Sequence, residues 1–353
     1  MPNLVKLNKG YLPKAFDNNK LQQIQAAADR LFVQLQQMNL ASFQLLERSK
    51  IYFNKCHIQR LHFSLECSAY NIIWGLNAFP NRAISELTIL DYGAGLGTQY
   101  LLAKACGFKA VYYNDYDPEW CSEAMAFCKH LQLDLDAYLP GDIRDVQQVF
   151  QAENKTVDIV ISRNVIEHLP DLSHYYSTLA LLNTAKISVV DSTSANTNNP
   201  LVLLNHIRKH LIVERKLYLP ARLKMIQEWA SDLTPAEQNQ LAQQTREYWG
   251  DGLHKIVEKY RTNKVIQVSH RFKTNTCNPV NGIWYERILT DQQYGKLLSG
   301  AGFKAQIQPG FWDTHYKIGV INVAFKLLNY FIRMVGLKGR PIAPFMIIVS
   351  SIN

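Results

Sequence analysis

The sequence predicts an α/β fold built on a doubly wound, seven-stranded sheet, with an N-terminal helical extension and a mostly helical insertion. Three observations predict it. Short apolar runs alternate with helix-compatible stretches between residues 86 and 192, an order typical of parallel sheets. The early runs end in glycines or acids, as strands do at a ligand-binding edge. Two long interruptions, at 195–285 and 311–340, separate the strands that complete the sheet.

Length and composition limit the classes of protein that fit. A chain of 353 residues with 47% hydrophobic content can bury a large core and carry more than one structural unit. No uninterrupted apolar run reaches the roughly 18 residues of a membrane span, and the start lacks a secretory apolar core, so we expect no transmembrane segment and a cytoplasmic location. The six cysteines show no paired metal spacing and are expected to be reduced packing thiols.

The first 80 residues are expected to form a helical extension. Apolar residues recur there at steps of three and four, which predicts a long amphipathic helix over residues 18–48. This helix could cover the ligand site, pair with a second subunit, or simply pack on the domain. The aromatic-rich stretch 51–76 is also expected to be helical. The residues of the amphipathic stripe are Leu21, Ile24, Ala28, Leu31, Leu35 and Met38.

The first strand leads into a glycine-rich turn. An apolar run at 87–90 delivers an acid, Asp91, and then three alternate glycines, Gly93, Gly95 and Gly97, before a helix begins at Thr98. Glycines let the backbone approach a ligand where a Cβ would collide, and the helix N-terminus presents free N–H groups. These features indicate a nucleotide-binding turn.

Three further strands end in residues suited to the rest of a nucleotide. The strand at 110–115 ends in Asp115, which could accept both hydroxyls of a ribose, and Pro118 is placed to open the next helix. Asp142 follows a third strand, and with its apolar neighbour Ile143 it suits an adenine amino group and ring face. The fourth strand, at 156–162, runs directly into the loop 163–171.

Taken together, these motifs resemble the class I methyltransferases that use S-adenosylmethionine, in the branch of quinone-biosynthesis and other small-molecule enzymes. The matching segments cover about residues 86–192, and a later match near 286–350 completes the fold. A dinucleotide fingerprint would place its third glycine where this chain has Thr98, so the spacing favours S-adenosylmethionine over NAD. The matching segments are Asp-x-Gly-x-Gly-x-Gly at 91–97, Asp-Tyr-Asp-Pro at 115–118, Gly-Asp at 141–142 and Val-Ile-Glu-His-Leu-Pro-Asp at 165–171.

The resemblance implies a Rossmann-like sheet, S-adenosylmethionine as cofactor and a role for each matching residue. The glycines would contact the methionine half, Asp115 the ribose and Tyr116 the adenine face. Asp91 would lie near the methionine end, or would anchor the glycine turn by accepting backbone N–H groups. The implied cofactor-binding residues are Asp91, Gly93, Gly95, Gly97, Asp115, Tyr116, Asp142, Ile143 and Asn164.

The loop after the fourth strand supplies the candidate catalytic residue. His168 could act as a general base, because an ordinary histidine pKa of about 6.5 suits proton removal near neutrality. The alternative is that Glu167 and His168 only fix this loop. Asn164 stands where some quinone-type relatives carry a metal-binding acid, and because an amide is a poorer ligand we predict no metal site. Arg163 could contact a substrate anion or form a salt bridge.

The remaining segments complete the sheet and divide the chain. We expect a helix at 175–184, a fifth strand at 187–191, a last helix near 289–303 with Thr290 as N-cap, and strands at 304–308 and 344–350. The predicted units are the extension 1–80, the cofactor-binding core 81–194, a substrate cap 195–285, and a C-terminal completion 286–353 that contains a short apolar insertion at 311–340.

Both insertions leave the ends of strands, the fifth and the sixth, where ligands bind in doubly wound sheets. We therefore expect both to roof the active site. Residues 201–275 carry 13 Lys plus Arg against 7 Asp plus Glu, an excess of six within the whole-chain charge of +9. This excess would attract an anionic substrate, or it is an ordinary solvated surface.

The apolar stretch 318–335 carries a polar face at helical spacing, formed by Asn322, Lys326, Asn329 and Arg333. It fits a helix that covers a hydrophobic substrate pocket, lies on a membrane surface, or packs against a neighbouring unit.

The favoured function is methyl transfer to a small-molecule or lipid-like acceptor. We expect the nucleophile to be an oxygen atom, and the acceptor could be anionic. One alternative is a nucleic-acid or protein methyltransferase that uses the basic insertion. We favour a small-molecule acceptor over a nucleic-acid base for two reasons. Enzymes that methylate exocyclic amines of bases usually carry an Asn-Pro-Pro-aromatic motif after the fourth strand, where this chain has Ser162-Arg163-Asn164-Val165. Methylation of the cytosine ring needs a nucleophilic cysteine in that neighbourhood, and none is present. A further alternative is a non-catalytic interaction module with the same fold.

Overall fold

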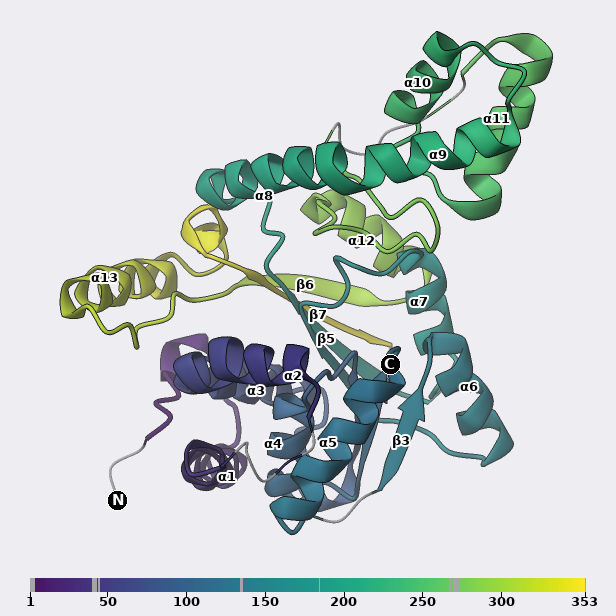
Figure 1. Cartoon of the computed structure of the whole chain (residues 1–353). Helices are drawn as coiled ribbons and strands as arrows, with labels where there is room; N and C mark the ends of the chain where they lie inside the picture. Colours follow the sequence, from purple (N-terminus) through teal and green to yellow (C-terminus); the bar gives the residue numbers. More distant parts are fainter. Residues whose placement is uncertain are drawn as a thin grey trace.

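The computed structural model describes residues 4–39, 43, 45–133, 136–183, 185–266, 268 and 274–352 (Figure 1). Within these residues, seven strands form one sheet in the order β3-β2-β1-β4-β5-β7-β6. Only β7 runs antiparallel to its neighbours, so the order reverses between β1 and β4 as in doubly wound sheets. The expected fold class is confirmed. The strands are β1 (Thr88–Tyr92), β2 (Ala110–Asp115), β3 (Ala137–Pro140), β4 (Ile159–Arg163), β5 (Ile187–Thr193), β6 (Lys304–Pro309) and β7 (Met346–Ile352).

Helices cover both faces of the sheet, and each face has its own apolar core (Figure 1). Strand side chains alternate between the two cores: Ile89 and Val111 join one, and Leu90 and Val160 join the other. The helices on the first face are α1 (Asn18–Gln36), α3 (Leu61–Leu76), α4 (Thr98–Cys106) and α5 (Pro118–His130). Those on the second face are α6 (Ile143–Ala152), α7 (Leu172–Leu179) and α12 (Asp291–Gly300).

The N-terminal helix is shorter than the sequence predicts. α1 ends at Gln36 instead of residue 48, with Gln37 as its C-cap. Residues 40–42 and 44 of that prediction lie outside the described residues. A second helix, α2 (Glu47–Tyr52), leads through a π turn and a 3-10 turn into α3. α1 packs against α3 and α4, with Ile24 and Leu31 fully buried.

Local signals place several helix ends as expected. Thr290 caps α12, and Gln293 completes a capping box with it. Pro118 opens α5. The helix expected at 175–184 instead begins at Leu172, because Asp171 accepts the N–H of His174 and so caps it earlier, and it ends at Leu179. Thr184 lies outside the described residues.

The first insertion forms a helical cap with a small core of its own, which contains Ile226, Leu241 and Val257. A buried ion pair joins Arg222 to Glu214 at 2.9 Å. Other cap cations are paired on the surface, Arg261 with Asp232 and Lys264 with Glu237, and these pairs leave the net excess of positive charge unchanged. Its helices are α8 (Pro200–Val213), α9 (Leu219–Trp229), α10 (Pro235–Gln244) and α11 (Gly250–Asn263), with a π turn (Glu214–Tyr218) between α8 and α9.

The second insertion forms α13 (Gly319–Val335), at the left of Figure 1, and a 3-10 turn (Gly336–Ile342) in which the carbonyl of Arg340 accepts a hydrogen bond from Asn196 at the start of the cap. By length and composition alone, Gly319–Ile342 could cross a membrane, with a mean hydropathy of 1.4. The expectation of no transmembrane segment counted uninterrupted apolar runs, and Asn322, Lys326 and Arg333 interrupt the run in this stretch.

Candidate active site

A cavity of about 410 Å³ opens where the order of the strands reverses. It lies at the carboxyl ends of β1, β2 and β4, and the short turn after β3 completes it. Several residues singled out in the sequence meet at this cavity although they are far apart in the chain. They are Gly93, Asp115, Tyr116, Asp142, Asn164 and His168.

Gly93 of the glycine turn lines the cavity, whereas Gly95 and Gly97 are not among its lining residues. Gly93 and Gly95 have positive φ values of +66° and +56°, which favour glycine. A Cβ on Gly93 would stand 2.6 Å from Val165 Cγ2, whereas a Cβ on Gly95 would meet no atom within 4 Å. Gly97, the N-cap of α4, has the left-handed conformation. Gly95 therefore leaves open space beside the backbone that a ligand could use.

Asp115 holds this turn in place. Its Oδ2 accepts the N–H of Gly95 at 2.8 Å, and its Oδ1 accepts the N–H of Asp117 at 2.9 Å. Burial raises the pKa of the carboxyl, and the backbone hydrogen bonds oppose that shift. A carboxylate has further lone pairs, so Asp115 can still accept ligand hydroxyls. Beside it, the ring of Tyr116 is 70% exposed.

Two predicted residues lie beneath the cavity lining. Asp91 is buried under the glycine turn, where its Oδ1 accepts the Nε2–H of Gln99 at 2.8 Å. Burial raises its pKa to about 7. Ile143 packs in the second core with Val146 and Phe150 and is not among the residues that line the cavity. Ile143 is the first residue of α6, and its side chain turns toward the sheet. This position does not support the contact with adenine that we expected, which stays a prediction.

Asp142 does line the cavity, and it also caps α6. Its Oδ1 accepts the N–H of Arg144 at 2.7 Å and, more weakly, that of Asp145 at 3.4 Å. The cap fixes the position of the carboxylate at the rim.

The side chains of Glu167 and His168 tie the loop after β4 to neighbouring segments. The buried Glu167 accepts the N–H of Ser194 at 3.3 Å, which joins this loop to the end of β5. Burial raises the pKa of Glu167 to about 7. The Nδ1 of His168 lies 3.0 Å from the carbonyl oxygen of Trp284. Because a carbonyl only accepts, Nδ1 carries the proton of the neutral ring and Nε2 remains an acceptor.

Asn164 and Arg163 end β4 in different ways. Asn164 has a positive φ of +56° and donates its N–H to Ser192 O at 2.7 Å while lining the cavity. Arg163 donates to the carbonyl and the hydroxyl of Ser64 on α3, both at 2.9 Å. It therefore fastens α3 to the sheet, a role that differs from the substrate contact and the salt bridge considered for it.

The cap supplies lining residues that the sequence did not indicate. Asn281 and Ile283 line the cavity from the segment that returns from the cap to the sheet. Trp284 donates its N–H to His168 O at 3.0 Å, and Arg287 donates its N–H to Glu167 O at 2.8 Å. The breaker-rich residues 278–282 predict a turn, but local sequence does not say which distant loop that turn meets.

The second insertion does not roof this cavity, contrary to expectation. Among the described residues of 311–340, none lines it. They instead enclose a separate cavity of about 480 Å³ with the N-terminal segment and α3. The reason is topological: β6 is the outermost strand, so the chain leaving it arrives beside α3 and far from the point where the strand order reverses.

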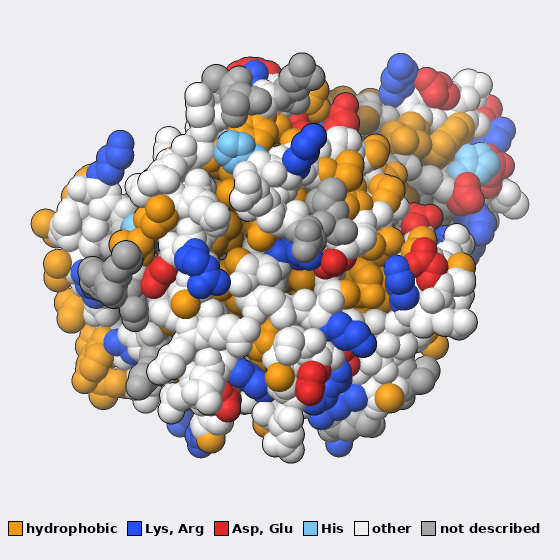
Figure 2. Space-filling model, turned by 90° about the horizontal axis from the view of Figure 1, so that it is seen from below, with side chains coloured by type: hydrophobic (Ala, Val, Ile, Leu, Met, Phe, Trp, Pro, Cys, Tyr) orange, Lys and Arg blue, Asp and Glu red, His pale blue; other side chains and the backbone are white. Residues whose placement is uncertain are grey.

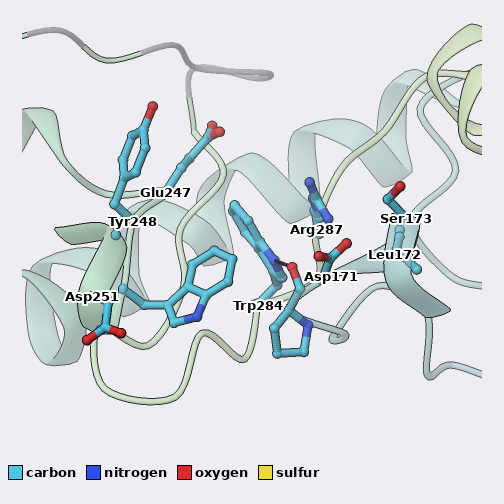
Figure 3. Close-up of a pocket in the computed structure, with 12 residues that line it drawn as sticks. Asp171, Leu172, Ser173, Glu247, Tyr248, Asp251, Trp284 and Arg287 are labelled. Carbon is cyan, nitrogen blue, oxygen red and sulfur yellow. Dashed lines mark hydrogen bonds between the residues drawn. The ribbon is translucent and has the colours of Figure 1, made fainter. Parts of the chain in front are cut away.

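A larger cavity of about 810 Å³ adjoins the first, and Pro170 lines both. Glu247, Tyr248 and Asp251 of the cap stand opposite the start of α7, with Trp284 and Arg287 between them (Figure 3). The indole N–H of Trp284 donates to Pro170 O at 3.2 Å, and the guanidinium of Arg287 lies 4.4 Å from the centre of the Trp284 ring. This second cavity extends the crevice under the cap.

The described residues contain no group of three or more His, Cys, Asp or Glu side chains that could hold a metal ion. Cys67, Cys106, Cys121, Cys128 and Cys277 are buried and free, and burial raises their thiol pKa values. The side chain of Cys56 lies outside the described residues.

Comparison with known families decides the class of enzyme. Residues 69–304 match a family model described as a methyltransferase domain. The chain belongs to this family. The matched segment contains the residues that line the crevice and the whole of the cap.

The methyltransferase also resembles solved structures, at the level of the fold. Magnesium protoporphyrin IX methyltransferase (ChlM) from Synechocystis PCC 6803, with bound SAH, is 14% identical, with a TM-score of 0.40 over 87% of this chain and 100% of that one. The plantazolicin methyltransferase BpumL, in complex with SAH, is 13% identical, with a TM-score of 0.39 over 94% and 98% of the two chains. A search among curated proteins finds no match.

Proposed function

We propose that this methyltransferase takes S-adenosylmethionine in the 410 Å³ crevice and methylates a small-molecule or lipid-like acceptor beneath the cap. One observation carries the proposal: the glycine turn, two strand-end acids and the His168 loop converge on a single crevice at the point where the strand order reverses. A non-catalytic module would have no need for this convergence.

The residues of the crevice fit this cofactor. Open space beside Gly95 admits the methionine half, Asp115 offers carboxylate oxygens to a ribose diol, and the exposed ring of Tyr116 can lie against adenine. When bound, S-adenosylmethionine supplies an activated sulfonium methyl group. The chain must then orient the acceptor, exclude water and remove a proton from a hydroxyl nucleophile. The free Nε2 of His168 is our candidate for that proton acceptor.

The shape of the site supports a small acceptor over a polymer. Asn281 and Ile283 roof the crevice, and the adjoining cavity lies between the cap and α7, so the space is enclosed by protein on several sides. The quinone-type branch, an oxygen or anionic acceptor and a cytoplasmic location stay parts of this proposal.

The cofactor site is tested by calorimetry with S-adenosylhomocysteine. We expect Asp115→Ala to weaken binding at least tenfold, about 1.4 kcal/mol, through lost charge-assisted hydrogen bonds. Asp158→Ala is the matched control, because Asp158 also accepts a backbone N–H, from Thr88 at 2.8 Å, but at the opposite end of the sheet. Equal affinity of the two variants would reject the ribose role.

The acceptor class is tested by incubating the protein with methyl-labelled cofactor and fractionated cell extract. We expect label in the lipid or small-metabolite fraction. Label in nucleic acid or protein would overturn the proposed acceptor class. If the protein binds S-adenosylhomocysteine but no fraction becomes labelled, the result would favour the non-catalytic alternative.

A further inference from the structure

The surface of α13 is arranged in the reverse of an ordinary amphipathic helix. Its outward stripe is apolar: Val320 is 80% exposed and Met334 is 65% exposed. Figure 2 shows hydrophobic side chains along the left edge of the molecule, the side on which α13 lies in Figure 1. The steps of three and four between these residues match one helical face. The exposed apolar side chains of α13 are Val320, Val323, Leu327, Tyr330, Phe331, Met334 and Val335.

The polar residues of α13 face the protein and hold the helix along its length. Asn322 pairs with both backbone groups of Tyr316, at 2.8 Å and 2.7 Å. Two turns later, Asn329 pairs in the same way with Trp312, at 2.7 Å and 2.8 Å. The ring of Phe325 stacks on that of Trp312 between these two points. The helix is therefore fastened flat against the domain with its apolar stripe outward.

The charge around this stripe has one sign. Between residues 314 and 352 the sequence contains no Asp or Glu, and it contains five Lys or Arg residues. Lys317 and Lys338 are exposed at the two ends of α13. Arg340 is already paired with Asp291. The five cations are Lys317, Lys326, Arg333, Lys338 and Arg340. Lys326 and Arg333 line the cavity on the inner side of α13, so Lys317 and Lys338 are the cations that flank the outward stripe.

We propose that the outward face of α13 docks the protein on a lipid bilayer that contains anionic lipid. An apolar stripe flanked by cations suits the boundary between headgroups and acyl chains. A symmetric contact between two copies would instead bring two cationic faces together. Although Gly319–Ile342 is long enough to span a bilayer, the paired Asn322 and Asn329 keep α13 against the domain, so it lies in the plane of the surface.

The test is co-sedimentation of the full chain with phosphatidylcholine vesicles, made with and without phosphatidylglycerol. We expect binding to the anionic vesicles that weakens as salt is added. The double variant Leu327→Glu/Phe331→Glu should bind the anionic vesicles about tenfold more weakly than the wild type. The control is Leu181→Glu/Met125→Glu, which adds the same charge at exposed apolar side chains on other elements and should bind like the wild type.

Affinity for S-adenosylhomocysteine reports whether each variant is folded, so failure of docking is distinguishable from failure of the cofactor site. Absence of vesicle binding by the wild type would overturn the proposal, as would equal losses in the two double variants. A wild-type dimer in analytical ultracentrifugation that Leu327→Glu/Phe331→Glu converts to monomer would assign the stripe to a second copy instead.

Discussion

Replacing Gly93 and Gly95 by alanine separates two reasons for a glycine in the same turn. Both residues have positive φ, so an alanine at either position costs about 1–2 kcal/mol of folding stability. At Gly93 the new Cβ also stands 2.6 Å and 2.8 Å from the two methyl carbons of Val165. Overpacking of this kind costs a further 1–3 kcal/mol or so. Gly95→Ala meets no such neighbour.

We therefore expect Gly93→Ala to lose about 2–5 kcal/mol of stability and Gly95→Ala only about 1–2 kcal/mol. The effect on affinity for S-adenosylhomocysteine should not follow the effect on stability, because we place the ligand in the open space beside Gly95. Gly95→Ala should weaken binding tenfold or more despite its smaller effect on stability.

Chemical denaturation gives the stabilities, and calorimetry gives the affinities. Adding Val165→Ala to Gly93→Ala should recover the overpacking part of the loss, which a double-mutant cycle measures. Equal destabilisation by Gly93→Ala and Gly95→Ala would refute the steric argument. Unchanged affinity in a folded Gly95→Ala protein would refute the placement of the ligand.

Two further predictions concern ionisable side chains. His168→Ala should lower kcat by about 10²–10⁴-fold with little change in S-adenosylhomocysteine affinity if His168 removes the proton, whereas parallel losses in both would indicate a purely structural side chain. Burial raises the pKa of Glu66 from 4.5 to about 7, so its carboxyl favours folding at low pH and that contribution is lost as pH rises through 7. Glu66→Gln should therefore gain stability relative to wild type between pH 4.5 and 8, by up to about 3 kcal/mol in denaturant titrations, and a difference that does not vary with pH would contradict the shift.

The core of the fold could be predicted because its signals are local. Glycines with positive φ, Pro118 at the start of α5 and Thr290 at the start of α12 each fix their own segment. The strand ends then meet at one edge because the strands are parallel, which brings Asp115, Asp142 and His168 together.

What the sequence did not predict depends on contacts between distant segments. The role of Arg163 is decided by Ser64, which lies almost one hundred positions earlier in the chain and packs against it only through α3. Asn281 and Ile283 reach the crevice only because the cap folds back on the loop after β4. The sequence led us to expect the second insertion over the active site. Its actual position depends on β6 being the edge strand, and the residues of the insertion do not reveal the strand order.

The two main-chain hydrogen bonds from Trp284 and Arg287 to the His168 loop have an evolutionary consequence. The segment that shapes the roof also sets the position of the candidate base, so the two cannot diversify separately. A relative that exchanges this cap for another would need a new partner for the carbonyls of Glu167 and His168. Changes of acceptor within this lineage should therefore be found in side chains of the cap more often than in its point of attachment.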